Sequence, residues 1–432
     1  MLKTDRHMIR ACASSFVGTA LEFYDYYVYA LASSLILGRV FFPSSSPLVT
    51  DLNAYGTLAA GFLARPFAGM LCGMMGDRYG RKKVLTLTVV GMGAATTAIG
   101  LVPGYASIGF AAPVLLVLLR IMQGLAVGGE WGGAVLLASE HAPERWKIFA
   151  ASFPQLGSPA GMLMALASFR GATALGTSAF TDWAWRIPFL LGGLIALGCF
   201  ILRRQVEETP DFLAARRESR TSREMLPVRL AGQWGRIFYA GLAVIVGSAG
   251  FFFVNTFLLG YAPVYMHVSR QFMLDAMLIA TVLQFLTQPL AAWIAQKTGE
   301  IRFLLTVAGL CVLLPFPMFR ALETHRFLPA AIAISATVVS LSAFYAAVAG
   351  FLANAFPARV RYTAISIAYQ TSASLVTGMT PIAGTLIASR FRTDWTPLAL
   401  FFSAMAVCSM AGVAGLARSC AESPEPVVLK GL

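Results

Sequence analysis

Two carboxylates stand three residues apart in an apolar stretch near the start of the chain. On a helix, this spacing places the side chains of Glu22 and Asp25 on one face. Neighbouring carboxylates away from water resist being ionised together, so one of them can take up and release a proton. We therefore predict that Glu22 and Asp25 couple the protein to protons. The alternative is that they only form salt bridges.

A buried cation is expected close to these acids. Arg120 opens a glycine-rich run, RIMQGLAVGGEWGG, and a guanidinium in apolar surroundings can bind a carboxylate through two parallel hydrogen bonds. We predict that Arg120 pairs with Asp25 in one state and with an anionic substrate in another, so that it serves both coupling and binding. A fixed ion pair is the alternative. The glycines around Glu130 favour a packing role for that residue.

Other polar side chains in apolar segments could contact a substrate. Arg65, which precedes Pro66, either binds an anion or pairs locally. A lone amide in such a segment more often joins helices than binds a ligand. The candidate substrate-binding residues are Arg65, Arg120, Tyr26, Gln155, Gln284 and Tyr369.

The sequence offers no enzyme chemistry. It contains no GxxxxGK[ST] phosphate loop, no GxSxG nucleophile elbow and no HExxH zinc motif, and its six cysteines are scattered without a CxxC pair. We therefore predict no catalytic residue, no metal and no cofactor. An ATP-driven pump and an intramembrane hydrolase are both disfavoured.

The composition points to the elements that position these residues. Of 432 residues, 57% are hydrophobic and 12% are charged, whereas a soluble chain carries roughly twice that charge. A helix needs about 20 apolar residues to span a bilayer. The apolar runs have helical length, so we predict an all-α protein with twelve transmembrane helices. The predicted spans are 11–38, 52–75, 84–102, 113–138, 148–169, 184–203, 236–260, 272–295, 302–320, 326–353, 362–388 and 396–418.

The positive charges are divided unevenly between the loops. The net charge is +13, but 23 of the 33 Lys and Arg lie in alternate loops that include both termini, eight lie in the opposite loops, and all six Lys are on the first side. This asymmetry predicts a multi-pass protein of the inner membrane with both termini cytoplasmic. It favours the lipid bilayer, and not nucleic acid, as the partner of the basic residues. We expect a monomer.

The two halves of the chain resemble each other. Residues 76–83 and 295–302 match at an offset of 219, and residues 140–147 and 354–361 match at an offset of 214. We infer duplicated six-helix bundles, residues 1–203 and 236–432, joined by a cytoplasmic linker, residues 204–235. The first repeated loop carries a predicted gating latch. Its residues are Asp77, Arg78, Arg81 and Lys82.

Several of these motifs also resemble a known family. The loop GDRYGRKK, residues 76–83, is similar to the signature of the major facilitator superfamily. Six motifs occur in the order seen in its metabolite:H+ symporter family: GTALEFYD, GFLARP, RIMQGLAVGGEWGG, WRIPF, EETP and FPARVRYT. The resemblance implies proton-driven uptake of shikimate, 2-oxoglutarate, citrate, other dicarboxylates, proline or betaine. It also implies that Asp25 and Arg120 couple protons and that Asp77 gates.

Two positions depart from that family. An acidic residue is usual where Asn354 stands, and a DRxGR-like loop is usual at residues 296–302. Both departures question the gate of the second half. The leading hypothesis is a proton-coupled importer of a small organic acid. The alternatives are an osmolyte importer or exporter of amphiphiles, and a receptor derived from a carrier.

Overall fold

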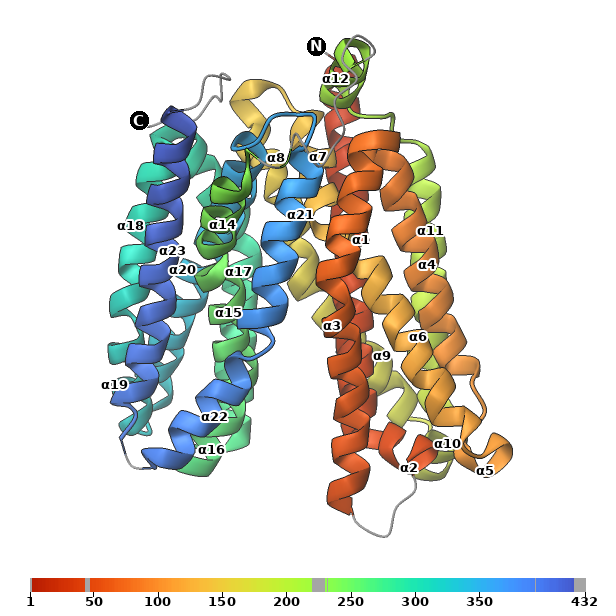
Figure 1. The fold of residues 1–432 in the computed structure, drawn as a ribbon. Coiled ribbons are helices and arrows are strands. Elements are labelled where there is room, and N and C mark those ends of the chain that lie inside the picture. The colour runs from red at the N-terminus through yellow and green to blue at the C-terminus, as the bar shows by residue number, and fades with distance from the viewer. Residues whose placement is uncertain (1, 43–46, 220–229, 231, 393, 423–432) are drawn as a thin grey trace. The chain divides into compact units, whose positions relative to one another are not determined.

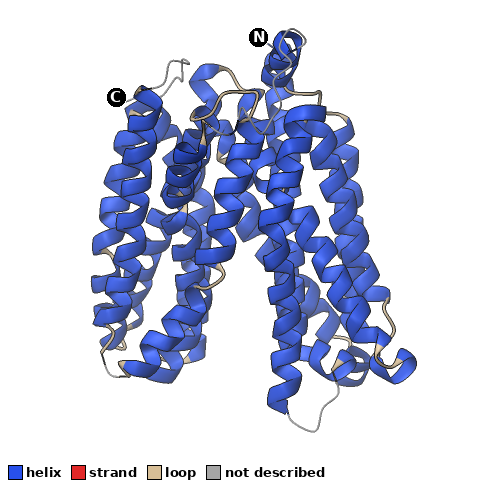
Figure 2. Cartoon of the chain, viewed as in Figure 1, coloured by secondary structure: helices blue, strands red, loops and turns tan. Residues whose placement is uncertain are grey.

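The computed structural model describes residues 2–42, 47–219, 230, 232–392 and 394–422. These residues form helices joined by short turns, without a strand among them (Figures 1 and 2). This confirms the predicted all-α class. Each of the twelve predicted spans coincides with one helix or with a series of consecutive helical segments.

The helices follow the chain without long interruptions. The first part contains α1 (Leu2–Ala32), η1 (Ser33–Leu37), α2 (Gly38–Phe41), α3 (Pro47–Tyr79), α4 (Arg81–Leu101), α5 (Tyr105–Ile108), α6 (Ala111–Val127), α7 (Glu130–Glu140), η2 (Glu144–Trp146), α8 (Lys147–Ala151), η3 (Phe153–Leu156), α9 (Gly157–Thr173), α10 (Thr177–Asp182), η4 (Ala184–Arg186), α11 (Ile187–Arg204) and α12 (Pro210–Ser219). The second part contains α14 (Trp234–Ala243), α15 (Ile245–Phe252), η5 (Phe253–Leu258), α16 (Leu259–Tyr265), α17 (Arg270–Thr298), α18 (Glu300–Leu313), α19 (Pro315–Glu323), α20 (Phe327–Asn354), α21 (Arg361–Ser372), η6 (Ala373–Thr377), α22 (Thr380–Arg390) and α23 (Thr396–Ala421).

Length and hydropathy identify membrane spans among these helices. Within the described residues, eight helical stretches are long and apolar enough to cross a bilayer. The other four predicted spans fall on α1, on α3, on the series from α8 to α9, and on the series from α21 to α22. Of these, α1 carries Glu22 and Asp25, and these two charged side chains lower its mean hydropathy.

The chain divides into two compact units. The first holds residues 1–141 and 153–214, and the second holds residues 142–152 and 215–432. Residues 204–214, which we had placed in the linker, therefore go with the first unit, and the short segment 142–152 goes with the second. In the second unit this segment packs through α8 on α17 and α20.

Each unit repeats the same helix pairs. In the first unit α1 packs on α9, α3 on α6, and α4 on α11. At the corresponding places of the second unit α14 packs on α21, α17 on α20, and α18 on α23. The glycines that start α4 and α18 also correspond, because Gly80 and Gly299 lie 219 residues apart and both have positive φ, 115° and 94°. The internal repeat inferred from sequence therefore extends to the backbone.

Candidate functional site

A cluster of buried polar side chains lies where α1, α4 and α6 meet; we call it the central cluster. Asp25 of α1 is 2% exposed, Thr96 of α4 is 0% exposed and Gln123 of α6 is 1% exposed. Thr96 Oγ1 and Gln123 Nε2 both donate hydrogen bonds to Asp25 Oδ1. A carboxylate removed from water needs such donors, so the cluster can hold Asp25 in its ionised form.

Arg120 completes the central cluster but is not held by Asp25 alone. Its Nη1 lies 3.8 Å from Asp25 Oδ2 and donates a hydrogen bond of 2.6 Å to Gln123 Oε1. The guanidinium also stacks over the ring of Tyr29, 3.8 Å from its centroid. Gln123 therefore bridges the acid and the base, and the predicted proximity of Asp25 and Arg120 is present in the structure.

The neighbouring predicted residues lie beside this cluster. Glu22 is 6% exposed, and its Oε2 has no hydrogen-bond partner in the described part of the chain. Arg65 of α3 is half-buried and lies 4.1 Å over the ring of Phe62, and that ring also contacts Tyr26 at a centroid distance of 5.9 Å. Phe62 thus links two of the predicted substrate-binding residues.

A second buried ion pair joins Glu130 to a residue that the sequence analysis did not single out, Arg203. Arg203, the last residue of the predicted span 184–203, is 0% exposed at the end of α11 and forms a bidentate pair with Glu130. Thr88 Oγ1 donates to the same carboxylate at 2.7 Å. A Cβ on Gly18 would lie 2.1 Å from Arg203 Nη2. This pair therefore locks α1, α4, α7 and α11 together, as the packing interpretation of Glu130 expects.

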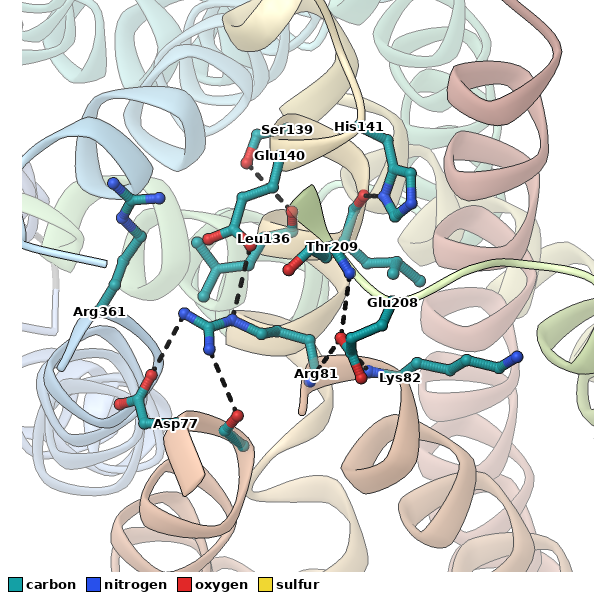
Figure 3. A network of polar contacts seen from close by, with 12 residues as sticks. Asp77, Arg81, Lys82, Leu136, Ser139, Glu140, His141, Glu208, Thr209 and Arg361 are labelled. Carbon is teal, nitrogen blue, oxygen red and sulfur yellow. Dashed lines mark hydrogen bonds and ion pairs between the residues drawn. The ribbon is translucent and has the colours of Figure 1, made fainter. Parts of the chain in front are cut away.

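Charged residues also gather at the turn between α3 and α4, in what we call the turn cluster: Asp77, Arg81, Glu140 and Glu208 (Figure 3). Arg81 is 1% exposed, with Nη2 3.3 Å from Asp77 Oδ1 and Nε 3.5 Å from Glu140 Oε2. The guanidinium thus joins the end of α3 to the end of α7. Arg81 and Asp77 were predicted in this role, whereas Glu140 was noted only in the repeat.

Glu208 caps the first turn of α4. Its Oε1 accepts hydrogen bonds from the backbone nitrogens of Arg81 at 2.9 Å, Lys82 at 3.2 Å and Thr209 at 3.1 Å (Figure 3). A carboxylate at a helix N-terminus is favoured by the unpaired N–H groups and the helix dipole. Lys82 adds a bond from Nζ to the carbonyl of Arg204 at 3.2 Å. Arg78 lies apart, exposed, over the ring of Tyr79 at 5.2 Å.

Comparison with known proteins identifies the family. The fold is similar to that of the proton:xylose symporter XylE of the major facilitator superfamily, with a TM-score of 0.79 at 18% identity over 94% of this chain and 95% of that one. Residues 11–234 match the family model described as sugar (and other) transporter. The chain is 34% identical over 402 residues to the shikimate transporter of Escherichia coli K12, covering 91% of each protein. The chain belongs to the major facilitator superfamily, among its sugar and metabolite transporters.

Another relative has a different kind of substrate in its name. The proline/betaine transporter of Escherichia coli K12 is 30% identical over 387 residues, which cover 87% of this chain and 77% of that protein. Our chain, like the relatives that it matches, is therefore a multi-pass membrane transporter of a small molecule, and not an enzyme.

The remaining predicted binding residues of the transporter lie outside the central cluster. In the first unit Gln155 accepts a hydrogen bond from Trp131 Nε1 at 3.2 Å, and its own Nε2 is buried without a partner in the described chain. In the second unit the hydroxyls of Tyr369 and Tyr345 lie 2.6 Å apart. Gln284 is 3% exposed on α17.

The sequence did not single out every member of the two clusters of this transporter. Thr96 and Gln123 are ordinary polar residues in apolar runs, and only their shared contact with Asp25 distinguishes them. One signal was available: Gln123 lies three residues after Arg120, a spacing that places the two side chains on one helix face. Glu208 lies 127 residues from the backbone nitrogen that it caps, so spacing could not reveal it.

Proposed function

We propose that this transporter is a proton-coupled symporter that imports a small organic acid by alternating access. The observation that carries the proposal is the geometry around Asp25. Its carboxylate is buried, yet the nearest guanidinium nitrogen, Arg120 Nη1, lies 3.8 Å away and is hydrogen-bonded to Gln123 instead. Arg120 therefore keeps a hydrogen-bond acceptor when the pair separates, but it loses its counter-charge. The similarity to a shikimate transporter supports an organic acid as the substrate.

The coupling follows from charge balance in the central cluster. When Asp25 is ionised, it neutralises Arg120, and an anionic substrate must compete with it. When Asp25 is protonated, Arg120 lacks a counter-charge in a medium where an unpaired charge costs about 2.5–3.5 kcal/mol or more. A substrate carboxylate then supplies that charge. Proton and acid therefore bind together, and each raises the affinity for the other by the same factor.

The hydrogen bonds around Asp25 can adjust to both states. Thr96 Oγ1 has a single hydrogen, and it lies within bonding distance of Asp25 and of the Met92 carbonyl, the latter at 2.8 Å. The hydroxyl can donate to the ionised carboxylate, or turn to Met92 and accept from the protonated one. Gln123 can keep its bond to Arg120 throughout. A proton can thus arrive and leave without a change of fold.

The other predicted residues receive roles in the same scheme. Glu22, whose Oε2 has no hydrogen-bond partner among the residues that the structure describes, is proposed as a second proton-carrying group. The proposed binding residues are Arg65, Arg120, Tyr26, Gln155, Gln284 and Tyr369, and the proposed gate contains Asp77, Arg78, Arg81 and Lys82. The turn cluster supports the gate, because Arg81 holds together the ends of α3 and α7 through Asp77 and Glu140.

We propose an orientation with both termini cytoplasmic, in the inner membrane, as a monomer. The support is the distribution of basic residues, with 23 of 33 in the loops on the side of the termini. Reporter fusions after residues 204 and 326 test the orientation. An inward-facing reporter is expected at the first and an outward-facing one at the second, and the reverse pattern would overturn the assignment.

Transport into proteoliposomes tests the proposed coupling. Purified wild type, Asp25→Asn and the control Asp182→Asn, which makes the same change at an exposed residue of α10, receive radiolabelled shikimate, citrate or 2-oxoglutarate with an inward proton gradient. We expect accumulation by wild type and by the control. Asp25→Asn should lose gradient-driven accumulation and keep exchange between equal pools. If wild type moves each acid only down its own gradient, symport is refuted.

Import of an osmolyte is the second candidate, favoured by the similarity to the proline/betaine transporter. The same proteoliposomes distinguish the two. Under the leading proposal, excess unlabelled shikimate inhibits uptake of the radiolabelled acid, and excess betaine does not. If betaine alone is accumulated, the substrate is a zwitterion, and Arg120 would meet its carboxylate without the need for a net anion.

A further inference from the structure

The second unit contains a cavity that the scheme above does not use; we call it the outer cavity. It measures about 410 Å³ and lies where α16, the end of α19 and the turn before α23 meet. One part of its lining is aromatic. The rings of Tyr261 and Tyr265 stack with centroids 5.1 Å apart, and Trp395 stacks on Phe319 at 5.5 Å. These flat apolar faces suit a ring of a small molecule.

The other part of the lining is basic. Arg320, Arg392 and His325 face the cavity together with a single carboxylate, Glu323. Both oxygens of Glu323 are already engaged: Oε2 accepts from Arg320 Nη1 at 2.9 Å and Oε1 accepts from Trp395 Nε1 at 2.6 Å. Arg320 therefore retains further donors, and Arg392 makes no hydrogen bond or ion pair with the described residues. The lining has an excess of positive charge.

A second acid near the cavity does not cancel that excess. Asp394 precedes Trp395 but is not part of the lining. Its Oδ1 accepts a hydrogen bond of 2.9 Å from the Thr396 backbone nitrogen, and these bonds to Thr396 hold the pKa of Asp394 below its usual range. The carboxylate thus serves the first turn of α23, where a helix N-terminus favours it.

The position of these arginines is itself unusual. In the orientation proposed above, the outward loops hold only eight basic residues, and half of them lie on the two turns around the outer cavity: Arg320, Arg326, Arg390 and Arg392. Outward loops of inner-membrane proteins tend to be poor in Lys and Arg. A local concentration against that tendency needs a reason, and an anion that approaches from outside supplies one.

We propose that the outer cavity binds a ring-bearing monocarboxylate, with its ring against Tyr261, Tyr265 and Trp395 and its carboxylate between Arg320 and Arg392. The inference rests on the proposed function in one respect, namely that the transported substrate is an organic acid. The site then collects that acid at the outer face before it reaches the central cluster. A carboxylate can bind a guanidinium in a bidentate manner, which a neutral amide cannot do.

Fluorine NMR of the full chain in detergent micelles tests this site, with 4-fluorobenzoate as the probe and 4-fluorobenzamide as its neutral counterpart. The test variant is the double substitution Arg320→Gln with Arg392→Gln. The matched control is Arg326→Gln with Arg390→Gln, which removes the same charge from the same two turns but not from the lining. We expect the Kd for 4-fluorobenzoate to rise at least tenfold in the test variant and less than twofold in the control. 4-Fluorobenzamide should not bind measurably to wild type or to either double variant.

Two outcomes would overturn the inference. Equal Kd values in the two double variants would mean that any attraction is general electrostatics, and equal binding of the amide would mean that no carboxylate is recognised. The exposed Arg320–Glu323 pair contributes little to folding, so the test variant should remain folded. Asp25→Asn separates the two proposals, because it should lose proton-driven accumulation, whereas the tenfold rise in Kd caused by Arg320→Gln with Arg392→Gln should persist in an Asp25→Asn background. If Asp25→Asn accumulates substrate normally, the proposed coupling fails while the cavity is judged by the binding data.

Discussion

The corresponding turns of the two units have the same backbone and different chemistry. Gly80 and Gly299 start the next helix with positive φ, and each amide bonds to the carbonyl four residues earlier at 3.1 Å. Around Gly80 the chain places an ionic network built on Arg81. At the positions of Asp77, Arg81 and Glu140, the second unit has Gln296, Glu300 and Asn354.

In the second unit, two uncharged side chains contact this turn. Gln296 Oε1 accepts a hydrogen bond of 2.8 Å from the Ile148 backbone nitrogen, and Asn354 Nδ2 donates to Glu300 Oε2 at 3.5 Å. The turn therefore forms without the acid–arginine–acid set of the first unit. The turn cluster is therefore not required to form a turn of this kind. We propose instead that it controls a conformational state of the transporter.

Removal of Arg81 from the turn cluster should produce the largest difference in stability between the two turns. Arg81→Gln leaves the buried carboxylates of Asp77 and Glu140 without their shared cation, and such a loss costs about 3–5 kcal/mol. Gln296→Ala in the second unit removes one hydrogen bond and should cost about 1 kcal/mol. Denaturation of the purified variants in detergent measures both. A cost below 1 kcal/mol for Arg81→Gln would show that the turn cluster does not stabilise the described fold.

An acidic residue at position 354, which corresponds to Glu140, should lower the stability of the second unit. Asn354→Asp places a carboxylate about 3.5 Å from that of Glu300, which is 1% exposed. Repulsion between the two charges should destabilise the protein by about 2–4 kcal/mol near pH 8.

The double variant Glu300→Gln with Asn354→Asp is the control for that experiment. It carries one carboxylate in place of two, so most of the lost stability should return. If Asn354→Asp is as stable as wild type at pH 8, the two side chains are not as close as the structure has them.

The glycines allow a finer comparison. Alanine at Gly80 or Gly299 strains the backbone, which costs about 1–2 kcal/mol at either position. At Gly80 the new Cβ would also lie 2.1 Å from Glu208 Oε2, so Gly80→Ala should cost about 1 kcal/mol more than Gly299→Ala. In a Glu208→Ala background this excess should vanish in a double-mutant cycle. An excess that persists would place its origin in the backbone and not in Glu208.

Much of the fold could be predicted from sequence, because hydropathy and charge act over whole segments. Twenty apolar residues in a row dictate a helix whatever their partners are, and the repeat at residues 76–83 and 295–302 marks the same glycine turn twice. What could not be predicted is which charged residue lies within a span. Arg203 looks like the start of a basic linker in sequence, and only the ion pair in the structure reveals that it is buried with Glu130.

The central cluster shows the same limit. Asp25 and Arg120 stand out because a charge inside a span is costly and rare. Thr96 and Gln123 carry no charge, so their involvement depends on helix rotation, which periodicity does not fix within a helix that is apolar all round. The prediction of binding residues from single polar side chains in the second half stays a prediction, because Gln284 and Tyr369 were selected by residue type alone.

Removal of the exposed cation beside each turn should have the smallest effect on stability, and here the second unit should lose more than the first. Arg78 and its counterpart Lys297 are both exposed cations over aromatic rings, but Arg78 lies 5.2 Å from the Tyr79 centroid and Lys297 lies 3.8 Å from that of Trp293. Cation–π attraction is stronger at short range and over Trp. Lys297→Ala should therefore cost about 0.5–1 kcal/mol and Arg78→Ala less than about 0.5 kcal/mol. A larger loss at Arg78, measured by the same denaturation, would mean that it takes part in the turn cluster after all, as the gating hypothesis holds.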